Sequence, residues 1–342
     1  LDDLPTGLPE FLAGGLQSAV PTNDNPADHL MDVLVSTDVA AVKKTSITVS
    51  RPLSEASDRD DDDDFDEAFA VSEWTQYWIL VRRFSYVFIV DEDQFPEVLM
   101  PGCVVTMING LAFRNFGTNL YIGGAILYNI IAHGMICSNG VVLNVPNERD
   151  LILREFRNGA YSVKAYWFAR ATVSIWAAVF MGFPWVAIWY SLVGLPASIS
   201  AIGHTFLGST LNALVISLVA SIVGLLNQTQ LAAGQVFMPI GDSMTIFAGL
   251  LIVRRFIKPY ALPVYYGLPI SYAYEIAATA ILELKGDDGK AVLKYYDLHP
   301  TDRHFDYAVL VAMILFWLFL GLLVAYRKIG GGTTSLAAAA AA

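Results

Sequence analysis

The stretch NERDLILREFRNGAYS, residues 147–162, places a dense group of acidic and basic side chains between two long apolar segments. Asn147 is a favourable N-cap residue and Gly159 a favourable stop, so the pattern predicts a helix over 148–158. Helical periodicity separates its apolar and charged residues onto opposite arcs, namely Ile152, Leu153 and Phe156 against Asp150, Arg154 and Arg157. The spacing of Asp150 and Arg154 favours an ion pair. We expect a short amphipathic helix outside the membrane, and a plain solvated loop element is the alternative.

The composition indicates a membrane protein. Hydrophobic residues make up 55% of the chain and charged residues only 15%, whereas a soluble domain carries about 25% charged residues. A run of about 20 apolar residues can cross a bilayer. The sequence has six such candidates, at 96–113, 119–145, 164–192, 205–226, 231–253 and 307–326. An apolar soluble helical core is the alternative, but such a core does not need runs of this length with so few charges.

The remaining segments are polar, acidic or amphipathic. The run DRDDDDDFDE at 58–67 repels itself and lacks the ligand spacing of a metal site, so we expect a disordered linker over 58–69. Residues 70–90 predict an amphipathic helix lying along the membrane surface, with a stripe formed by Trp74, Tyr77, Trp78 and Val81. Residues 329–342 form a low-complexity tail to which we assign no function. Cys103 and Cys137 both fall inside predicted spans, which does not support a disulfide framework.

Several motifs in the chain resemble the G (White) subfamily of ABC transporters. The segment ERDLILREFRNGAYSVKAYWFA at 148–169 resembles the connection between the second and third transmembrane helices of that family. The matching positions are Glu148, Arg149, Arg154, Glu155, Gly159, Tyr161, Ser162 and Tyr166. Three further segments agree in order: NPADHLMDVL at 25–34 with the tail of the nucleotide-binding domain, EWTQYWILVRR at 73–83 with the connecting helix, and PISYAYEIAATAILELKG at 269–286 with a re-entrant turn.

The resemblance implies an all-α membrane protein with six transmembrane helices over 96–328. It further implies an interfacial connecting helix at 70–90, a cytosolic coupling helix, and a re-entrant external segment after the fifth span. Residues 1–57 are then the tail of a nucleotide-binding domain and a linker. An N-terminus on the cytosolic side is consistent with the positive-inside rule for most basic residues. Arg254, Arg255 and Lys258 fall on the outer side and disagree with it.

By the same resemblance, the chain is the membrane domain of an ATP-driven exporter that forms a dimeric pathway for lipids, sterols or amphipathic small molecules. The implied coupling residues are Glu148, Arg149, Arg154, Glu155 and Arg157. The implied substrate cavity is lined by Ala132, His133, Ile136, Asp242 and Thr245, beneath an apolar plug of Leu250 and Leu251. We expect no catalytic residue and no metal site in this chain.

Two features of an ATPase are not found in the sequence. A phosphate-binding loop needs Gly-x-x-x-x-Gly-Lys-Ser/Thr, and the nearest string, GDDGKA at 286–291, lacks both the spacing and the hydroxyl residue. The family's Leu-Ser-Gly-Gly signature is also missing. We therefore expect ATP and Mg²⁺ to bind a nucleotide-binding domain outside this chain, with hydrolysis belonging to the full-length protein. The other expected partners are a second half-transporter, in a homo- or heterodimer, and the lipid of the plasma membrane or an organelle membrane, but no nucleic acid.

Two other functions fit the same apolar spans. In an ion-coupled secondary transporter or channel, His133 and Asp242 would be proton or ion sites, because an ionisable side chain inside a bilayer is costly unless it has a role. A non-transporting scaffold without an ATPase domain is the second alternative. His133 could equally be a packing residue, and Asp242 an N-cap near the cytosolic end of its helix.

Overall fold

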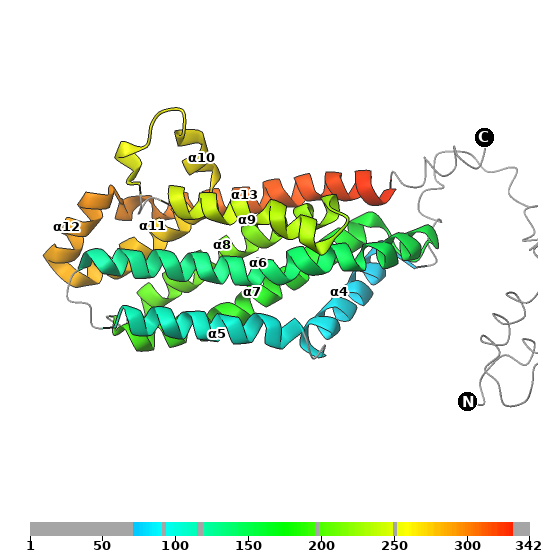
Figure 1. Ribbon diagram of the computed structural model, residues 1–342, viewed down its shortest axis with the longest axis horizontal. Coiled ribbons are helices and arrows are strands. Elements are labelled where there is room, and N and C mark those ends of the chain that lie inside the picture. The colour runs from blue at the N-terminus through cyan, green and yellow to red at the C-terminus, as the bar shows by residue number, and fades with distance from the viewer. Residues whose placement is uncertain (1–70, 91–93, 115–118, 196–197, 249–251, 331–342) are drawn as a thin grey trace, which may run out of the picture. The chain divides into compact units, whose positions relative to one another are not determined.

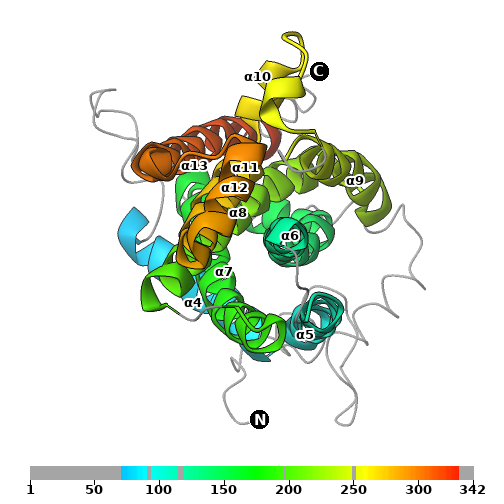
Figure 2. The same cartoon turned by 90° about the vertical axis from the view of Figure 1, so that its left-hand side faces the viewer.

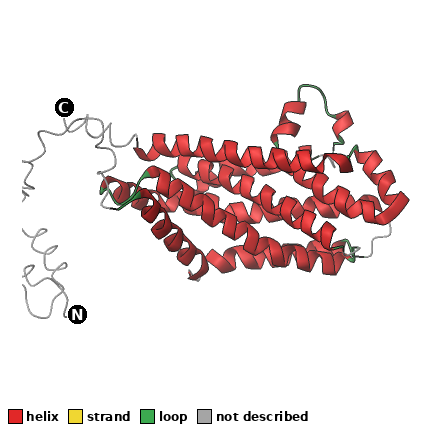
Figure 3. Ribbon diagram, turned by 180° about the vertical axis from the view of Figure 1, so that it is seen from behind, coloured by secondary structure: helices red, strands yellow, loops and turns green. Residues whose placement is uncertain are grey.

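The computed structural model describes residues 71–90, 94–114, 119–195, 198–248 and 252–330, and every regular element in these ranges is a helix (Figures 1 and 3). This confirms the predicted all-α class. The predictions for 1–57 and for the acidic linker at 58–69 lie outside the described residues, as does the tail predicted at 329–342 apart from its first two residues.

Each of the six predicted spans corresponds to one helix. These are α5 Gln94–Ala112, α6 Asn119–Arg157, α7 Val163–Val193, α8 Ile199–Leu226, α9 Gln230–Phe247 and α13 Arg303–Ala325. Four stretches of the described chain are long and apolar enough to cross a bilayer: Tyr121–Phe156, Val163–Val193, Ile199–Leu226 and Pro300–Ile329. In α5 the apolar part found among the described residues is Met100–Ala112, and α9 has 18 residues that include Asp242. The structure therefore confirms a multi-pass membrane domain, and the count of six stays a prediction.

Helix α8 lies at the centre of the bundle, between α6, α7, α11 and α13 (Figure 2). Small residues allow this close packing, as is common between membrane helices. A Cβ on Gly224 would stand 2.7 Å from Cβ of Val145, and one on Gly134 would stand 2.7 Å from Cδ1 of Ile216. The backbones of α6 and α8 therefore lie close together along much of the length of the two helices.

The coupling helix is not a separate element, as predicted at 148–158, but the last part of α6. This helix runs without a break from Asn119 to Arg157 and includes Pro146. Packing explains the difference, because Val145 is fully buried against Gly224 and holds the chain helical where Pro146 and Asn147 favour a new start. The predicted stop is confirmed, with Gly159 at a φ of 70° two residues after the last residue of the helix.

Helix α4, Glu73–Val90, runs obliquely to the long helices and packs against the first half of α7 (Figure 1). Its predicted aromatic stripe is divided between two environments. Val81 is buried and Tyr77 half-buried against α7, whereas Trp74 and Trp78 are exposed. The packed face also includes Leu80, which sequence periodicity did not single out. Both faces of α4 are therefore apolar, one toward α7 and one toward its surroundings.

The segment after α9 folds into the short helices α10 Leu262–Gly267, α11 Pro269–Leu282 and α12 Gly286–Tyr296. Every residue of α11 is buried, and the helix packs against α8 and α13. These helices lie at one end of the bundle, and α4, the end of α6 and the last residues of α13 gather at the other (Figure 1). The basic residues predicted for the cytosol therefore share one end, although the re-entrant geometry itself stays a prediction.

Candidate functional site

An ion pair joins α4 to the end of α6. The Nη1 of Arg83 donates to both carboxylate oxygens of Glu155 at 2.8 Å, and the hydroxyl of Tyr161 donates to Oε2 of the same residue at 3.0 Å. Burial and the nearby Glu155 carboxylate raise the pKa of Tyr161, so its hydroxyl stays protonated and continues to donate. The hydrogen bond to Glu155 raises the pKa of Arg83. Glu155 is thus held by two donors from different elements.

A second ion pair joins α6 to α7, between Glu148 and Arg170. The Arg170 guanidinium also lies over the ring of Phe84 from α4, at 5.6 Å from its centroid, a geometry in which the aromatic face attracts the cation. Glu148 stands seven residues before Glu155, so both carboxylates project from the same side of α6. The two pairs therefore hold α4, α6 and α7 together through one face of α6.

An amide side chain completes the contact between α4 and the turn before α7. Oε1 of Gln76 accepts from the backbone N–H of Ser162 at 2.8 Å, and its Nε2 donates to the carbonyl of Val71 at 2.6 Å. The Ser162 hydroxyl in turn caps α7 by accepting from the N–H of Ala165 at 3.2 Å. Because Gln76 and Arg83 are seven residues apart, both lie on the face of α4 that packs here. We call Gln76, Arg83, Glu148, Glu155, Tyr161 and Arg170 the polar clamp.

A cavity of about 160 Å³ adjoins the clamp, between α4, α5, α6 and α7. Glu148 and Arg170 line one part of it, and apolar residues such as Phe84, Val87 and Ile136 line most of the rest. The cavity therefore leaves α4 and α5 incompletely packed against α6.

The five predicted coupling residues have different surroundings. Glu148 and Glu155 belong to the polar clamp. Arg154 is exposed, and its Nε donates to the carbonyl oxygen of Asp150 at 3.3 Å instead of pairing with the carboxylate. Arg149 is half-buried and forms no ion pair with another described residue. The side chain of Arg157 lies outside the described residues. The partners Gln76, Arg83 and Arg170 were missed, although an amide or arginine on the packed face of an apolar helix is a usable signal.

The predicted cavity residues that the structure describes are gathered only in part, because His133 and Ile136 line one small pocket between α5, α6 and α7 and the others lie elsewhere. His133 is fully buried and stacks on Trp185 of α7 at 5.6 Å. Asp242 is exposed on α9, which begins at Gln230 behind a Thr229 cap, so the reading of Asp242 as an N-cap is wrong. The structure therefore does not bring His133 and Asp242 together.

The other positions divide in the same way. Ile136 lines the cavity beside the polar clamp, and Ala132 is buried in the main core. Thr245 lines an open cleft of about 330 Å³ between α5, α6 and α9, together with Asn109 and Tyr128. The plug residues Leu250 and Leu251 lie outside the described residues. Among the predicted positions that the structure describes, Thr245 faces an open space between α6 and α9.

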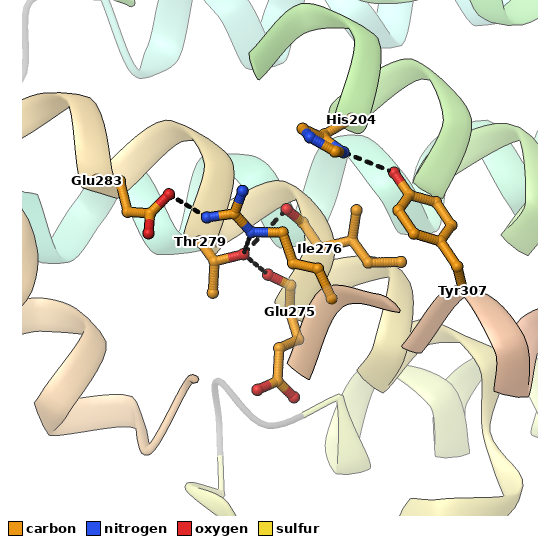
Figure 4. Close-up of polar contacts among 7 residues, drawn as sticks. His204, Glu275, Ile276, Thr279, Glu283 and Tyr307 are labelled. Carbon is orange, nitrogen blue, oxygen red and sulfur yellow. Dashed lines mark hydrogen bonds and ion pairs between the residues drawn. The ribbon is translucent and has the colours of Figure 1, made fainter. Parts of the chain in front are cut away.

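A second group of polar contacts lies at the opposite end, around α11 (Figure 4). Arg303 pairs with Glu283 and donates to the Thr279 hydroxyl at 2.9 Å, and Nδ1 of His204 lies 2.9 Å from the Tyr307 hydroxyl. The buried carboxylate of Glu275 accepts from the N–H of His299 at 2.9 Å. Burial raises the pKa of Glu275, and the His299 N–H and Arg254 oppose the rise. The contacts of Arg303 and Glu275 fix α11 and the residue after it to α13 and to the loop before α13, and the His204–Tyr307 contact fixes α8 to α13.

Two comparisons with known proteins agree on the kind of domain. A family model described as ABC-2 type transporter matches residues 75–282, from α4 to the end of α11. The ABC transporter G family member 24 of Dictyostelium discoideum is 23% identical over 280 residues, which cover 74% of this chain and 23% of that relative. The chain therefore spans less than a quarter of the length of that relative. Both matches support the resemblance drawn from the motifs at 73–83 and 148–169, and both ion pairs of the polar clamp lie within the matched family region.

Proposed function

Because the chain belongs to the ABC-2 type transporter family, we propose that it is the membrane domain of an ATP-driven exporter of the G type. The observation that carries the proposal is the polar clamp, which connects α4 and the charged end of α6 to α7. A channel or an ion-coupled carrier has no need of a charged helix end fastened to a preceding amphipathic helix. An exporter driven by a separate ATPase domain needs such an element.

The proposed mechanism passes movement from outside the membrane into the spans. A nucleotide-binding domain would contact the exposed residues at the end of α6, among them Asp150 and Arg154. Since α6 is one continuous helix, a displacement at this end is carried directly into the membrane part of α6. The clamp then makes α4 and α7 move with it. ATP can drive the change only if the nucleotide-binding domain binds the inward and outward states with different affinity.

We further propose that α9 faces a second half-transporter and that α5 and α9 complete six spans. Asp242 is exposed on α9 among exposed apolar side chains, namely Leu231, Val236, Met238 and Ile246. An ionisable group at membrane depth needs protein or water around it, and an interface between two copies or two related chains would provide both. The open cleft at Thr245 lies beside this face and supports a substrate pathway there for a lipid, sterol or amphipathic molecule. Ala132, His133 and Ile136 stay predicted positions of that pathway.

The exporter is tested with the full-length protein in proteoliposomes that contain a fluorescent phospholipid or sterol. We expect export that needs hydrolysable ATP and continues when ionophores dissipate proton and sodium gradients. Export that ignores ATP and stops with the ionophores would support the ion-coupled alternative. Replacing Arg154 and Glu155 together should leave membrane insertion intact and uncouple ATP turnover from export.

A further inference from the structure

A surface groove of about 560 Å³ runs between the beginnings of α4 and α7. Glu73, Trp74 and Tyr77 line it from α4, and the lining residues from α7 are Lys164, Ala165, Phe168 and Thr172. The groove lies beside the polar clamp but shares no residue with it. Its floor is fixed, because Ala165 is buried and the Tyr77 hydroxyl hydrogen-bonds to that of Thr172 at 2.9 Å.

The two charges of the groove are only loosely paired. Nζ of Lys164 lies 3.8 Å from Oε1 of Glu73, and each side chain is 54% exposed. A surface pair of this kind contributes about 0–1 kcal/mol. Separating Lys164 from Glu73 therefore costs little free energy, and each side chain can pair instead with an opposite charge on a ligand. A ligand that pairs with both side chains must carry an anionic group and a cationic group.

Three aromatic rings line the groove together with the Glu73–Lys164 pair. The rings of Trp74 and Tyr77 stack with centroids 5.3 Å apart, and Phe168 faces them across the groove from α7 with an exposed side chain. Aromatic faces attract cations, and quaternary ammonium groups are bound by aromatic side chains in this way. Trp and Tyr also favour the headgroup level of a bilayer. The rings and Glu73 together favour a bulky cation, whereas Lys164 favours a phosphate.

An apolar stripe on α7 continues from the groove along the helix. It is formed by the exposed side chains of Phe168, Ile175, Trp176 and Val179, whose spacing places them on one face of the helix. A lipid whose headgroup occupied the groove could lay its acyl chains along this stripe. A free soluble zwitterion would leave the stripe without a role.

We propose that this groove binds the headgroup of a phosphocholine lipid from the surrounding bilayer, with the quaternary ammonium against Trp74, Tyr77 and Glu73 and the phosphate on Lys164. The inference rests on the chain's membrane location and on the groove, and it does not depend on the transported substrate or on ATP. A purely anionic headgroup would meet Glu73 without a cation to offset it. An ethanolamine headgroup would present a small, strongly hydrated ammonium that gains less from the aromatic faces.

The test is native mass spectrometry of the full-length protein released from nanodiscs with equal amounts of dioleoyl phosphatidylcholine, phosphatidylethanolamine and phosphatidylglycerol. We expect phosphatidylcholine to be retained preferentially. Trp74→Leu and Lys164→Gln should each lower its retention about two- to fivefold, as the loss of one exposed cation–π or charge contact implies. Phe319→Leu and Lys328→Gln serve as controls, because both residues are exposed and neither lines the groove, and neither should change retention.

Equal retention of the three lipids would overturn the proposal. A preference for phosphatidylglycerol would also overturn it, because it would show that the site binds anionic headgroups through basic side chains. Equal retention of phosphatidylcholine and phosphatidylethanolamine would also overturn it, since the aromatic rings would then have no selective role. Because Trp74 and Lys164 are exposed, their variants should unfold at the wild-type temperature. An effect on retention that is matched by the two control variants would likewise contradict the proposed site.

Discussion

Breaking the ion pair between Glu148 and Arg170 should destabilise the protein by different amounts, depending on which partner is removed. The side chain of Arg170 is 12% exposed and that of Glu148 is 26% exposed. Glu148→Gln leaves the largely buried Arg170 guanidinium without a counter-charge, with the Phe84 ring 5.6 Å from it. Leaving a buried charge without its partner costs about 3–5 kcal/mol. Arg170→Met leaves a carboxylate that water reaches more easily, so we expect a smaller loss of about 1–2 kcal/mol.

The assay is reversible unfolding in mixed detergent micelles for the wild type, both single variants and the double variant Glu148→Gln/Arg170→Met. The double variant should lose less stability than the sum of the two single losses, because no unpaired charge remains. The control is the pair of Asp287 and Lys290, whose side chains are 97% and 71% exposed. Its removal should change stability by about 0.5 kcal/mol or less. Equal losses for the two single variants, or strict additivity in the double variant, would refute this account of the pair.

Three further predictions concern other parts of the domain. Gly159→Ala should lower the free energy of unfolding by about 1 kcal/mol through backbone strain alone, because φ is 70° and no atom stands within 4 Å of the added Cβ. In thermal unfolding Gly159→Asn should lose less stability, and equal losses for the two variants would contradict the strain argument. Gln76→Leu should cost about 1–3 kcal/mol by leaving the Ser162 N–H without its acceptor. Gln76→Glu keeps that acceptor but places a buried carboxylate oxygen against the Val71 carbonyl to which Nε2 donates, so it should cost at least as much in the same assay, and a smaller loss would contradict the role of this second hydrogen bond. Burial raises the pKa of Glu275 in the folded protein, so the folded state prefers the protonated acid and loses stability as pH rises from the unfolded-state value, about 4.3, toward the raised value. Glu275→Gln should therefore raise the melting temperature at pH 7 and have a smaller effect at pH 4.5, and a larger gain at the lower pH would show that the sign is wrong.

The apolar spans could be predicted from the sequence because hydrophobic runs of membrane length are local features. The end of α6 could not be predicted correctly, since Pro146 and Asn147 favour a break and only the contact of Val145 with Gly224, far along the chain, holds the helix together. Contacts between residues far apart in the sequence decide how the helices pack. An isolated stretch of sequence cannot indicate which helices pack with their backbones close together.

The candidate site was predictable in part for the same reason. The pattern around Glu148 and Glu155 indicated a charged functional helix, but their partners Arg170 and Arg83 lie on other helices. Gln76 carries no charge, and its only distinguishing feature in the sequence is its position on an apolar face of the helix. For His133 and Asp242, hydropathy identified two unusual residues, and only the packing of α6 and α9 revealed that they point to different surroundings.

We propose above that the polar clamp transmits ATP-driven movement into the membrane spans. The most direct measurement is the number of substrate molecules exported per ATP hydrolysed by the full-length protein in proteoliposomes. The clamp variants are Arg83→Gln and Glu155→Gln, and the matched control is Arg82→Gln, whose exposed side chain neighbours Arg83 and forms no ion pair with another described residue. We predict that both clamp variants keep hydrolysing ATP and export fewer molecules per ATP, while the control matches the wild type. An unchanged ratio in the clamp variants would contradict the claim.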